Sequence, residues 1–194
     1  GFADNNGSFS GSSYVVFGGA NWGASAQAGT VGDDTVNGTA AAETLIGGEG
    51  NDTLNGAGGA DVLRGGSGND AITVDDLTFA QVDGGSGSDT LHLNGTGLSL
   101  DLTSVGHGVD GIEIINLTGT GNNTLTLNAA AISQHGGGNT LRVDGNAGDT
   151  VTLSDFINWT NTGTTDIGAV TYDVYNQGAL TLQVANTVGV PTPA

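Results

Sequence analysis

The sequence predicts an all-β protein, a right-handed parallel β-roll or β-solenoid that continues in less regular coils and ends in a β cap. Three observations predict this fold. A nine-residue period runs through residues 29–73, apolar residues alternate with polar ones in residues 98–153, and aromatic strands follow in residues 154–188. A short fixed period is typical of stacked coils, alternation is typical of half-buried strands, and crossovers between parallel strands are almost always right-handed.

The N-terminal segment, residues 1–28, contains one convincing strand, Tyr14–Phe17, between glycine-rich turns. One strand cannot fold alone, so we expect it to pair with the first coil or with a neighbouring molecule. The phrase DNNGSFSGSSYVVFGG resembles the closing strand of an FG-GAP blade of an integrin-like β-propeller. Asp4, Asn5 and Asn6 would then belong to the calcium loop of such a blade, although a plain polar turn is the interpretation that we favour.

The nine-residue period consists of five consecutive phrases, which read GTVGDDTVN, GTAAAETLI, GGEGNDTLN, GAGGADVLR and GGSGNDAIT. Each phrase has a carboxylate at its sixth position and an aliphatic residue, which is Val, Leu or Ile, at its eighth. The carboxylates are Asp34, Glu43, Asp52, Asp61 and Asp70, and the aliphatic residues are Val36, Leu45, Leu54, Leu63 and Ile72. The carboxylate and the aliphatic residue recur together every nine residues, and this joint period predicts one repeated structural unit.

Each phrase combines a glycine loop with a short strand. Glycine allows backbone angles that a side chain would forbid, so the first six residues can turn their carbonyl oxygens toward a common point. The last three residues run extended, with the eighth pointing inward, and two phrases make one turn. Loops two phrases apart therefore stack, with Asp34, Asp52 and Asp70 on one edge and Glu43 with Asp61 on the other. Calcium takes about six to eight oxygen ligands, and such stacked loops offer them.

The period breaks after Thr73 and resumes as GGSGSDTLH, which places Asp89 at the sixth position. The offset from Asp70 is 19 residues, one more than the regular spacing. A bulge or a longer loop can absorb one extra residue, so we expect Asp89 to continue the row. Phe79, in the interruption, is expected to cap the hydrophobic interior of the coil.

Residues 29–92 resemble the RTX, or hemolysin-type, calcium-binding repeats, a family that carries this nonapeptide. The resemblance implies that several Ca²⁺ ions bind between aspartates and the carbonyl oxygens of the loops. The implied metal-binding residues are Asp34, Gly47, Gly48, Gly50, Asp52, Gly56, Gly58, Gly59, Asp61, Gly65, Gly66, Gly68, Asp70, Gly84, Gly85, Gly87 and Asp89. Glu43 departs from the pattern, and its loop lacks two glycines, so the Glu43–Asp61 site should be the weakest or empty.

A simple energy comparison indicates that the ion is structural. Ordering nine residues costs roughly 9–18 kcal/mol, whereas one buried aliphatic side chain returns only about 1.5–3 kcal/mol. Strand hydrogen bonds supply part of the difference, but stacked carboxylates repel one another until a divalent cation lies between them. We therefore predict that residues 29–92 are largely disordered without calcium and fold when it binds.

Residues 93–188 are predicted to extend the solenoid. Apolar pairs such as Leu125 and Leu127 alternate with polar residues between Gly/Asn turns, and Asn128–Gln134 is the one short helix that we expect. Asp144 and Asp149, in the phrase DGNAGDTVTL, are weaker calcium candidates, and a plain turn explains them equally well.

The aromatic residues Phe156, Trp159, Tyr172 and Tyr175 lie near the C-terminal end of this extension. Strands Val170–Tyr175 and Ala179–Val184 are predicted to form a hairpin that covers the open end of the coil. Residues 189–194 are expected to be a flexible tail.

Composition excludes several function classes. The chain of 194 residues has 20 acidic and 2 basic residues, a formal charge of −18, which argues against nucleic acid as a partner. There is no cysteine, so no disulfide or thiol chemistry is expected, and no apolar stretch is long enough to insert in a membrane. No signal peptide is evident, and a start at Gly1 favours an internal cut. The non-periodic acidic residues are explained by a solvated surface.

The phrases GIEIINLTGTGNNTLTL and NTLRVDGNAGDTVTL lie within residues 98–188. With these phrases, residues 98–188 resemble the C-terminal region of very long bacterial adhesins exported by type I secretion. This resemblance implies a Gram-negative protein that passes unfolded through the type I secretion machinery and folds outside, at the cell surface, on external calcium. Our leading hypothesis is a secreted, non-enzymatic module for adhesion or display. The alternative is a self-assembling structural protein that forms a filament or surface layer by strand donation. An enzyme is the third hypothesis, since HExxH and GxSxG are absent and His92, His107 and His135 are scattered.

Overall fold

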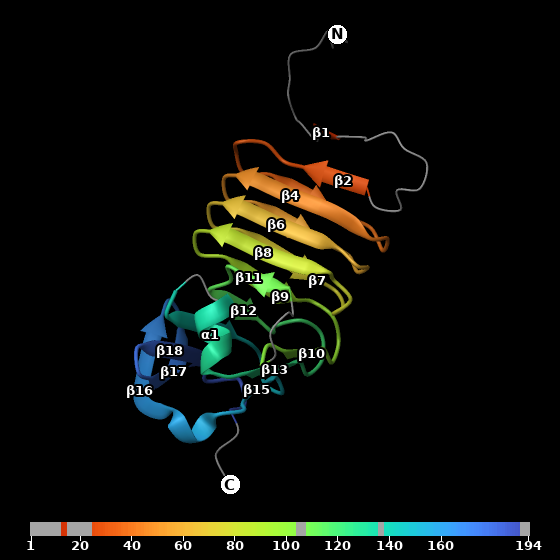
Figure 1. Ribbon diagram of the computed structural model, residues 1–194. Coiled ribbons are helices and arrows are strands. Elements are labelled where there is room, and N and C mark those ends of the chain that lie inside the picture. Colours follow the sequence, from red (N-terminus) through yellow and green to blue (C-terminus); the bar gives the residue numbers. More distant parts are fainter. Residues whose placement is uncertain (1–12, 15–24, 104–107, 136–137, 191–194) are drawn as a thin grey trace, which may run out of the picture.

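The computed structural model of the protein describes residues 13–14, 25–103, 108–135 and 138–190 (Figure 1). The predicted all-β solenoid is confirmed: the described residues form three sheets and one short α-helix. Of the expected strand Tyr14–Phe17, only Tyr14 is described, and the Asp4–Asn6 turn lies outside the described residues. Most of the FG-GAP-like phrase falls there as well.

The six-stranded sheet contains, in spatial order, β1 (Ser13–Tyr14), β2 (Ser25–Ala28), β4 (Glu43–Glu49), β6 (Val62–Ser67), β8 (Gln81–Ser86) and β11 (Val109–Asp110). The nine-stranded sheet contains β16 (Thr160–Ile167), β17 (Val170–Gln177), β18 (Leu180–Ala185), β14 (Thr140–Asp144), β12 (Ile114–Asn116), β9 (Thr90–Leu93), β7 (Ala71–Val74), β5 (Thr53–Asn55) and β3 (Thr35–Asn37). The three-stranded sheet contains β10 (Ser99–Asp101), β13 (Thr124–Leu127) and β15 (Thr150–Leu153).

The repeat region is a regular parallel coil, in which strands of the two larger sheets alternate along the chain. Thr35 lies opposite Thr53 and Leu45 opposite Leu63, so one turn takes two phrases, as predicted. The aliphatic residue at the eighth position of every phrase is buried, with an exposed fraction of at most 6%. Figure 1 shows these strands as an even stack beneath the N-terminal end.

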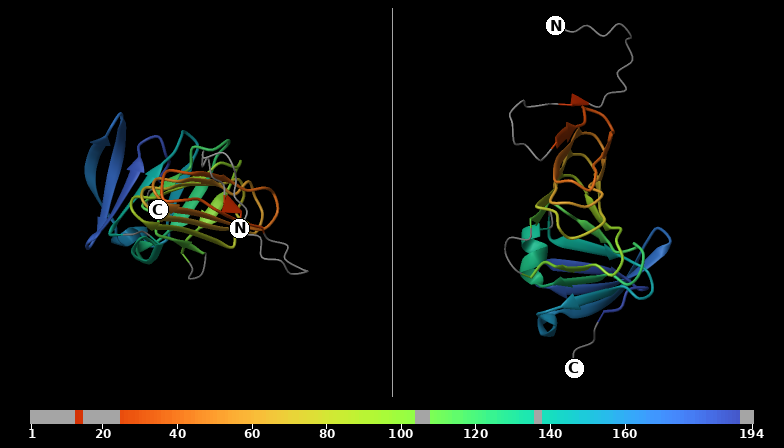
Figure 2. Two further views of the ribbon diagram at one scale, coloured as in Figure 1. Left: turned by 90° about the horizontal axis from the view of Figure 1, so that it is seen from above. Right: turned by 90° about the vertical axis from the view of Figure 1, so that its right-hand side faces the viewer.

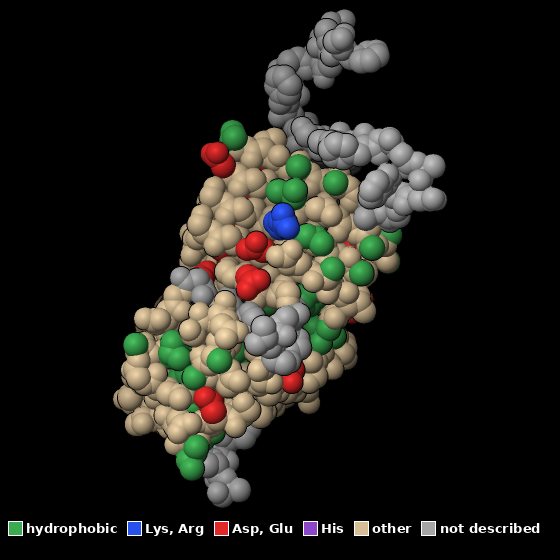
Figure 3. Space-filling view, viewed as in Figure 1, with side chains coloured by type: hydrophobic (Ala, Val, Ile, Leu, Met, Phe, Trp, Pro, Cys, Tyr) green, Lys and Arg blue, Asp and Glu red, His purple; other side chains and the backbone are tan. Residues whose placement is uncertain are grey.

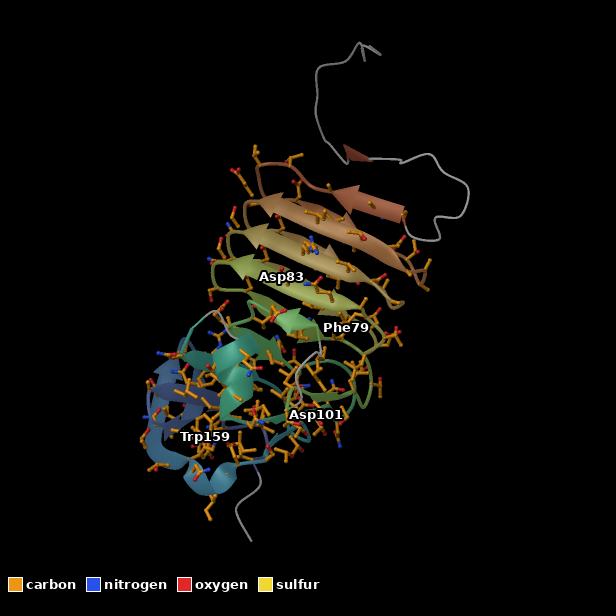
Figure 4. All side chains as sticks on the ribbon, in the orientation of Figure 1. Phe79, Asp83, Asp101 and Trp159 are labelled. Atoms are coloured by element: carbon orange, nitrogen blue, oxygen red, sulfur yellow. The ribbon has the colours of Figure 1, made fainter. Side chains whose placement is uncertain are left out.

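The extra residue of the interrupted phrase is absorbed between β7 and β8. Val62 lies opposite Gln81, a spacing of 19 residues, and the parallel register continues beyond it. Phe79 lies in this connection, at the side of the coil, and packs against the core (Figure 4). The predicted continuation of the coil is thus confirmed.

Beyond the repeats the solenoid widens but its main sheet continues. Strand β12 pairs in parallel with β9 on one side and with β14 on the other. The predicted helix is confirmed as α1 (Ala129–His135), where Asn128 Oδ1 accepts a hydrogen bond from the N–H of Ala131 as an N-terminal cap. In the side view of Figure 2 the narrow roll stands above this broader part.

The predicted aromatic hairpin is confirmed as β17 and β18, and it is more closely joined to the solenoid than the sequence indicates. Strand β18 pairs in parallel with β14, so the hairpin extends the nine-stranded sheet. The structure adds β16, which the alternation of apolar residues did not mark because nearly all of its side chains are exposed. A short 3-10 helix, η1 (Phe156–Asn158), precedes it, and the Trp159 side chain is buried in the lower part of the molecule (Figure 4).

The N-terminal strand β1 pairs antiparallel with β2 of the same chain, with Ser13 opposite Ala28. It adds one strand to the N-terminal end of the six-stranded sheet. In the part of the chain that the structure describes, no helix has the length and apolar character needed to cross a membrane.

Candidate calcium sites

A row of carboxylates follows the edge where strands of the six-stranded sheet lead into the nine-stranded sheet. In each step, Oδ1 of one aspartate accepts a hydrogen bond from the backbone N–H of the acidic residue one coil earlier. Asp34 donates to Asp52 over 2.8 Å, Asp52 to Asp70 over 2.7 Å, and Asp70 to Asp89 over 2.7 Å. The structure therefore brings together the four aspartates that the sequence placed in one row.

The second oxygen of three of these carboxylates has no partner. Oδ2 of Asp52, Asp70 and Asp89 is buried and accepts no hydrogen bond, and the three residues are at most 2% exposed. Burying a charged carboxylate oxygen without a hydrogen bond costs free energy of folding unless a positive charge lies near it. Burial accordingly raises the pKa of each of these carboxyl groups, and the neighbouring acidic residues raise it further.

Asp89 shows the largest effect in the row. Its burial, together with the charges of Asp70, Glu113 and Asp83, raises the pKa of its carboxyl group to about 6, although the hydrogen bond from Asp70 N–H lowers it. A cation beside the row would reverse this shift, because it stabilises the charged form.

Glycine is required where the loops stack on these carboxylates. A Cβ atom at Gly47 would collide with Asp52 Oδ2 and with the Gly65 carbonyl oxygen of the next coil. The same collision would occur at Gly65 with Asp70 Oδ2 and the carbonyl oxygen of Gly84. Each unpartnered oxygen thus lies beside a backbone carbonyl oxygen, which gives an all-oxygen donor set of the type that calcium prefers.

Most of the other predicted loop glycines have the backbone angles that glycine favours. Positive φ values occur at Gly48, Gly50, Gly58, Gly59, Gly66, Gly68, Gly85 and Gly87. Gly56 precedes Asp61, and Gly84 precedes Asp89, at the start of their loops. Gly56 lies near Asp61 Oδ2 and Gly84 near Asp89 Oδ2, and the carboxylate and carbonyl oxygens present fit a hard divalent cation.

The two ends of the row differ from its centre. Asp34 Oδ2 accepts hydrogen bonds from Thr30 N–H at 2.5 Å and from Thr30 Oγ1 at 2.8 Å. At the other end, Asp89 N–H donates to Glu113 Oε2 at 2.8 Å. Sequence reasoning missed Glu113, and the signal that could have found it is an acidic residue directly before strand β12.

The opposite edge carries the predicted pair of Glu43 and Asp61. Glu43 N–H donates to Asp61 Oδ1 at 2.9 Å, so the two residues are stacked as expected. The Glu43 carboxylate is buried and has protein partners: Thr39 donates to both of its oxygens and Ser25 to one. Burial raises the pKa of Asp61, and the charges of Glu43 and Asp76 raise it further.

The weaker candidates, Asp144 and Asp149, have protein partners for both carboxylate oxygens. Asp144 Oδ2 pairs with Arg142 at 3.1 Å, and its Oδ1 accepts a hydrogen bond from the Tyr172 hydroxyl at 2.6 Å. Asp149 Oδ1 accepts from Asn123 N–H, and its Oδ2 accepts from Asn146 N–H. Neither carboxylate shows the unpartnered oxygen that marks the row.

Comparison with protein families supplies the decisive observation. Residues 28–59, 37–72 and 81–95 match the model of the RTX calcium-binding nonapeptide repeat, in four copies. These residues are similar to RTX repeats, and we refer to residues 28–95, which span the matches, as the RTX region. Comparison with curated proteins and with solved structures gave no match. RTX nonapeptide repeats bind multiple calcium ions, so calcium is the cofactor of this region.

The carboxylates of the row are spaced along the edge of the roll and are not gathered in one cluster of side chains. Among the described residues, no group of three or more His, Cys, Asp or Glu side chains could hold a metal ion. In this row each coil contributes one carboxylate, and the oxygen atoms near its Oδ2 belong to the backbone. His92, on β9, lies 3.4 Å from Thr118 Oγ1 and not beside the row.

The raised pKa values predict that acid partly replaces calcium in the RTX region. A folded-state pKa of about 6 for Asp89, against 3.8 for an ordinary aspartate carboxyl, means that the folded state binds more protons between these two pH values. Calcium-free protein should therefore lose stability as the pH rises through this window. Protein stripped of calcium on a chelating resin should gain strand signal in circular dichroism when the pH is lowered from about 7 to about 5. Equal signal at both values would contradict the prediction, and Asp89→Asn should weaken the response.

Proposed function

We propose that the chain is a non-enzymatic, calcium-binding module of a secreted bacterial surface protein, which folds on external calcium and serves adhesion or display. The observation that carries the proposal is the row of buried, unpartnered oxygens on Asp52, Asp70 and Asp89. These atoms lie in the RTX repeats and need a cation to be stable when charged.

The proposed ligands are the side chains of Asp52, Asp70 and Asp89 together with the loop carbonyl oxygens around them. A bound calcium ion supplies positive charge between the stacked carboxylates. The chain's own contribution is to hold each carboxylate by its Oδ1, through the hydrogen bond from the preceding coil, so that Oδ2 stays aimed into the loop. The glycines keep the space beside Oδ2 free of side chains.

Asp34 and Glu43, which the sequence also predicts as ligands, are weaker candidates than the three central aspartates. Asp34 and Glu43 are each hydrogen-bonded by the threonine at the second position of their own phrase, Thr30 and Thr39. Because the threonine hydroxyl donates a hydrogen bond to the carboxylate, the carboxylate depends less on a cation for its stability. We therefore place the ions in the centre of the row and expect the edge of Glu43 to be empty or weak.

A secreted, structural role is supported by what is typical of RTX repeat proteins and by the charge of this chain. RTX repeat proteins are typically secreted and bind calcium outside the cell. The chain has 20 acidic residues and 2 basic ones. The surface in Figure 3 shows single charged side chains scattered among mostly uncharged ones. Arg64 on β6 lies opposite Asp83 on β8. This surface offers nucleic acid no basic patch among the described residues, and export through type I machinery of a Gram-negative cell remains part of the proposal.

Self-assembly into a filament or surface layer is the second candidate, and one observation favours it. Strand β16 ends the nine-stranded sheet, and within the described part of the chain its one partner strand is β17. A long strand at the edge of a sheet is a template for pairing with another chain. The pairing of β1 with β2 in the same chain shows, by contrast, that a strand of the N-terminal segment has a partner without a neighbour.

The test is a calcium titration of chelator-treated protein, followed by circular dichroism and size-exclusion chromatography, with magnesium as the control. We expect a cooperative gain of strand signal with calcium alone, because the unpartnered carboxylate oxygens repel one another until the ion binds. An elongated monomer would support the module, whereas a shift to high mass would support the filament. A spectrum that is already folded and does not respond to calcium would contradict both.

A further inference from the structure

Asn123 lies in the coils beyond the matched RTX repeats, in the loop before β13, and its side chain is fully buried. Its Oδ1 accepts a hydrogen bond from Leu98 N–H of the preceding coil at 2.7 Å, and its own N–H donates to Asp149 Oδ1 of the next coil at 2.8 Å. Asp52 makes the same two contacts, with Asp34 before it and Asp70 after it. Asn123 therefore has the stacking role of a repeat aspartate.

The difference lies in the second terminal atom. Asp52 Oδ2 has no partner, whereas Asn123 Nδ2 donates to three backbone carbonyl oxygens. The donor distances are 3.4 Å to Leu93, 3.3 Å to Gly95 and 3.1 Å to Leu117. Several carbonyl oxygens directed at one point attract positive charge, and the two amide hydrogens of Asn123 provide it.

The glycine beside this site repeats the arrangement of the RTX loops. A Cβ atom at Gly119 would collide with the Leu93 carbonyl oxygen and would lie 3.0 Å from Asn123 Nδ2. At Gly47 the same added atom would meet the Gly65 carbonyl oxygen and Asp52 Oδ2. The two loops thus share a glycine, a carbonyl oxygen and a stacked side chain, and they differ in whether that side chain is a carboxylate or an amide.

We propose that the Asn123 amide takes the place of a cation in the cage formed by the carbonyl oxygens of Leu93, Gly95 and Leu117. The coils around Asn123 are then held together without calcium, whereas the RTX coils above them need the ion. The chain consists of a calcium-independent base and a calcium-dependent roll that share one nine-stranded sheet. This inference rests on the proposed function only for the behaviour of the roll.

The test compares Asn123→Asp with Asn123→Ala in the full chain by hydrogen exchange with peptide resolution, with and without calcium. In the unaltered protein, residues 114–127 should stay protected in chelator, while residues 44–73 exchange freely. In Asn123→Asp, a carboxylate oxygen would face the three carbonyl oxygens, so protection of residues 114–127 should fall about tenfold or more in chelator and return with calcium but not with magnesium. Asn123→Ala should lose protection in both conditions, because it supplies neither an amide nor a carboxylate.

Two results would overturn the proposal: fast exchange of residues 114–127 of the unaltered protein in chelator, or an Asn123→Asp variant that gains nothing from calcium. Calorimetry adds a second readout, since Asn123→Asp should bind one calcium ion more than the unaltered protein. Failure of the proposed function would look different, because residues 44–73 of the unaltered protein would then show the same protection with and without calcium.

Discussion

Alanine in place of Gly68 is expected to destabilise the RTX roll strongly even with calcium present, whereas alanine in place of Gly32 is expected to leave its stability almost unchanged. Both residues are the fourth of their phrase, and the sequence gives no reason to rank them. The structure separates them. Gly68 has a φ of +123°, and a Cβ atom there would collide with the Gly50 carbonyl oxygen of the preceding coil.

Gly32 lies in the first repeat loop, where no earlier repeat loop stacks on it. Its φ lies outside the glycine region, and a Cβ atom would meet no other atom within 4 Å. The backbone strain at Gly68 costs of the order of 1–3 kcal/mol, and the collision adds to it. We therefore expect Gly68→Ala to lose at least about 3 kcal/mol of unfolding free energy. For Gly32→Ala we expect a change within about 0.5 kcal/mol.

Thermal melts of the two variants in excess calcium, followed by circular dichroism, measure this difference. Gly32→Ala is the matched control, because it makes the same chemical change at the same repeat position. Equal melting temperatures for the two variants would mean that the loops do not stack as closely as the structure shows.

The repeat region could be predicted from the sequence in detail because its two registers are local. A carboxylate every nine residues and an aliphatic residue two positions later define the loop, the strand and the stacking distance together. The same reasoning predicted that Asp89 would follow Asp70 across an insertion, and the hydrogen bond between them confirms this contact. Their assignment as calcium ligands stays a prediction.

The features that the sequence did not reveal depend on contacts between distant coils. Glu113 joins the row 24 residues after Asp89, at a spacing outside the period. Strand β16 has no apolar alternation because both of its faces are largely exposed. The role of Asn123 depends on carbonyl oxygens from up to 30 residues away, so no local pattern could mark it.

Replacing Asp70 by Asn is expected to have opposite effects in the presence and absence of calcium. Asp70 is the central member of the three carboxylates with an unpartnered oxygen, so it faces Asp52 on one side and Asp89 on the other. With calcium, the loss of this charge should raise the calcium concentration at the folding midpoint about tenfold or more, since affinity follows the number of charged ligands.

Without calcium, the same substitution should stabilise the fold. Burial and the charge of Asp52 raise the pKa of Asp70, which means that its charged form destabilises the calcium-free coil. An amide removes that charge and keeps the Oδ1 that accepts from Asp52 N–H. Its Nδ2 would lie near the Gly84 carbonyl oxygen, as Asn123 Nδ2 lies near that of Leu117.

The measurement is a calcium titration and a melt in chelator for Asp70→Asn, with Asp166→Asn as the control. Asp166 accepts a hydrogen bond from Thr171 on the exposed hairpin, far from the repeats in sequence, so its substitution should change neither quantity. Destabilisation of Asp70→Asn in both conditions would contradict the prediction, because the Asp70 charge would then not destabilise the calcium-free coil. The change in stability caused by Asp70→Asn reverses sign between the two conditions only if the charged carboxylate destabilises the calcium-free coil and stabilises the calcium-bound one. The same property makes the folding of the roll depend on the ion.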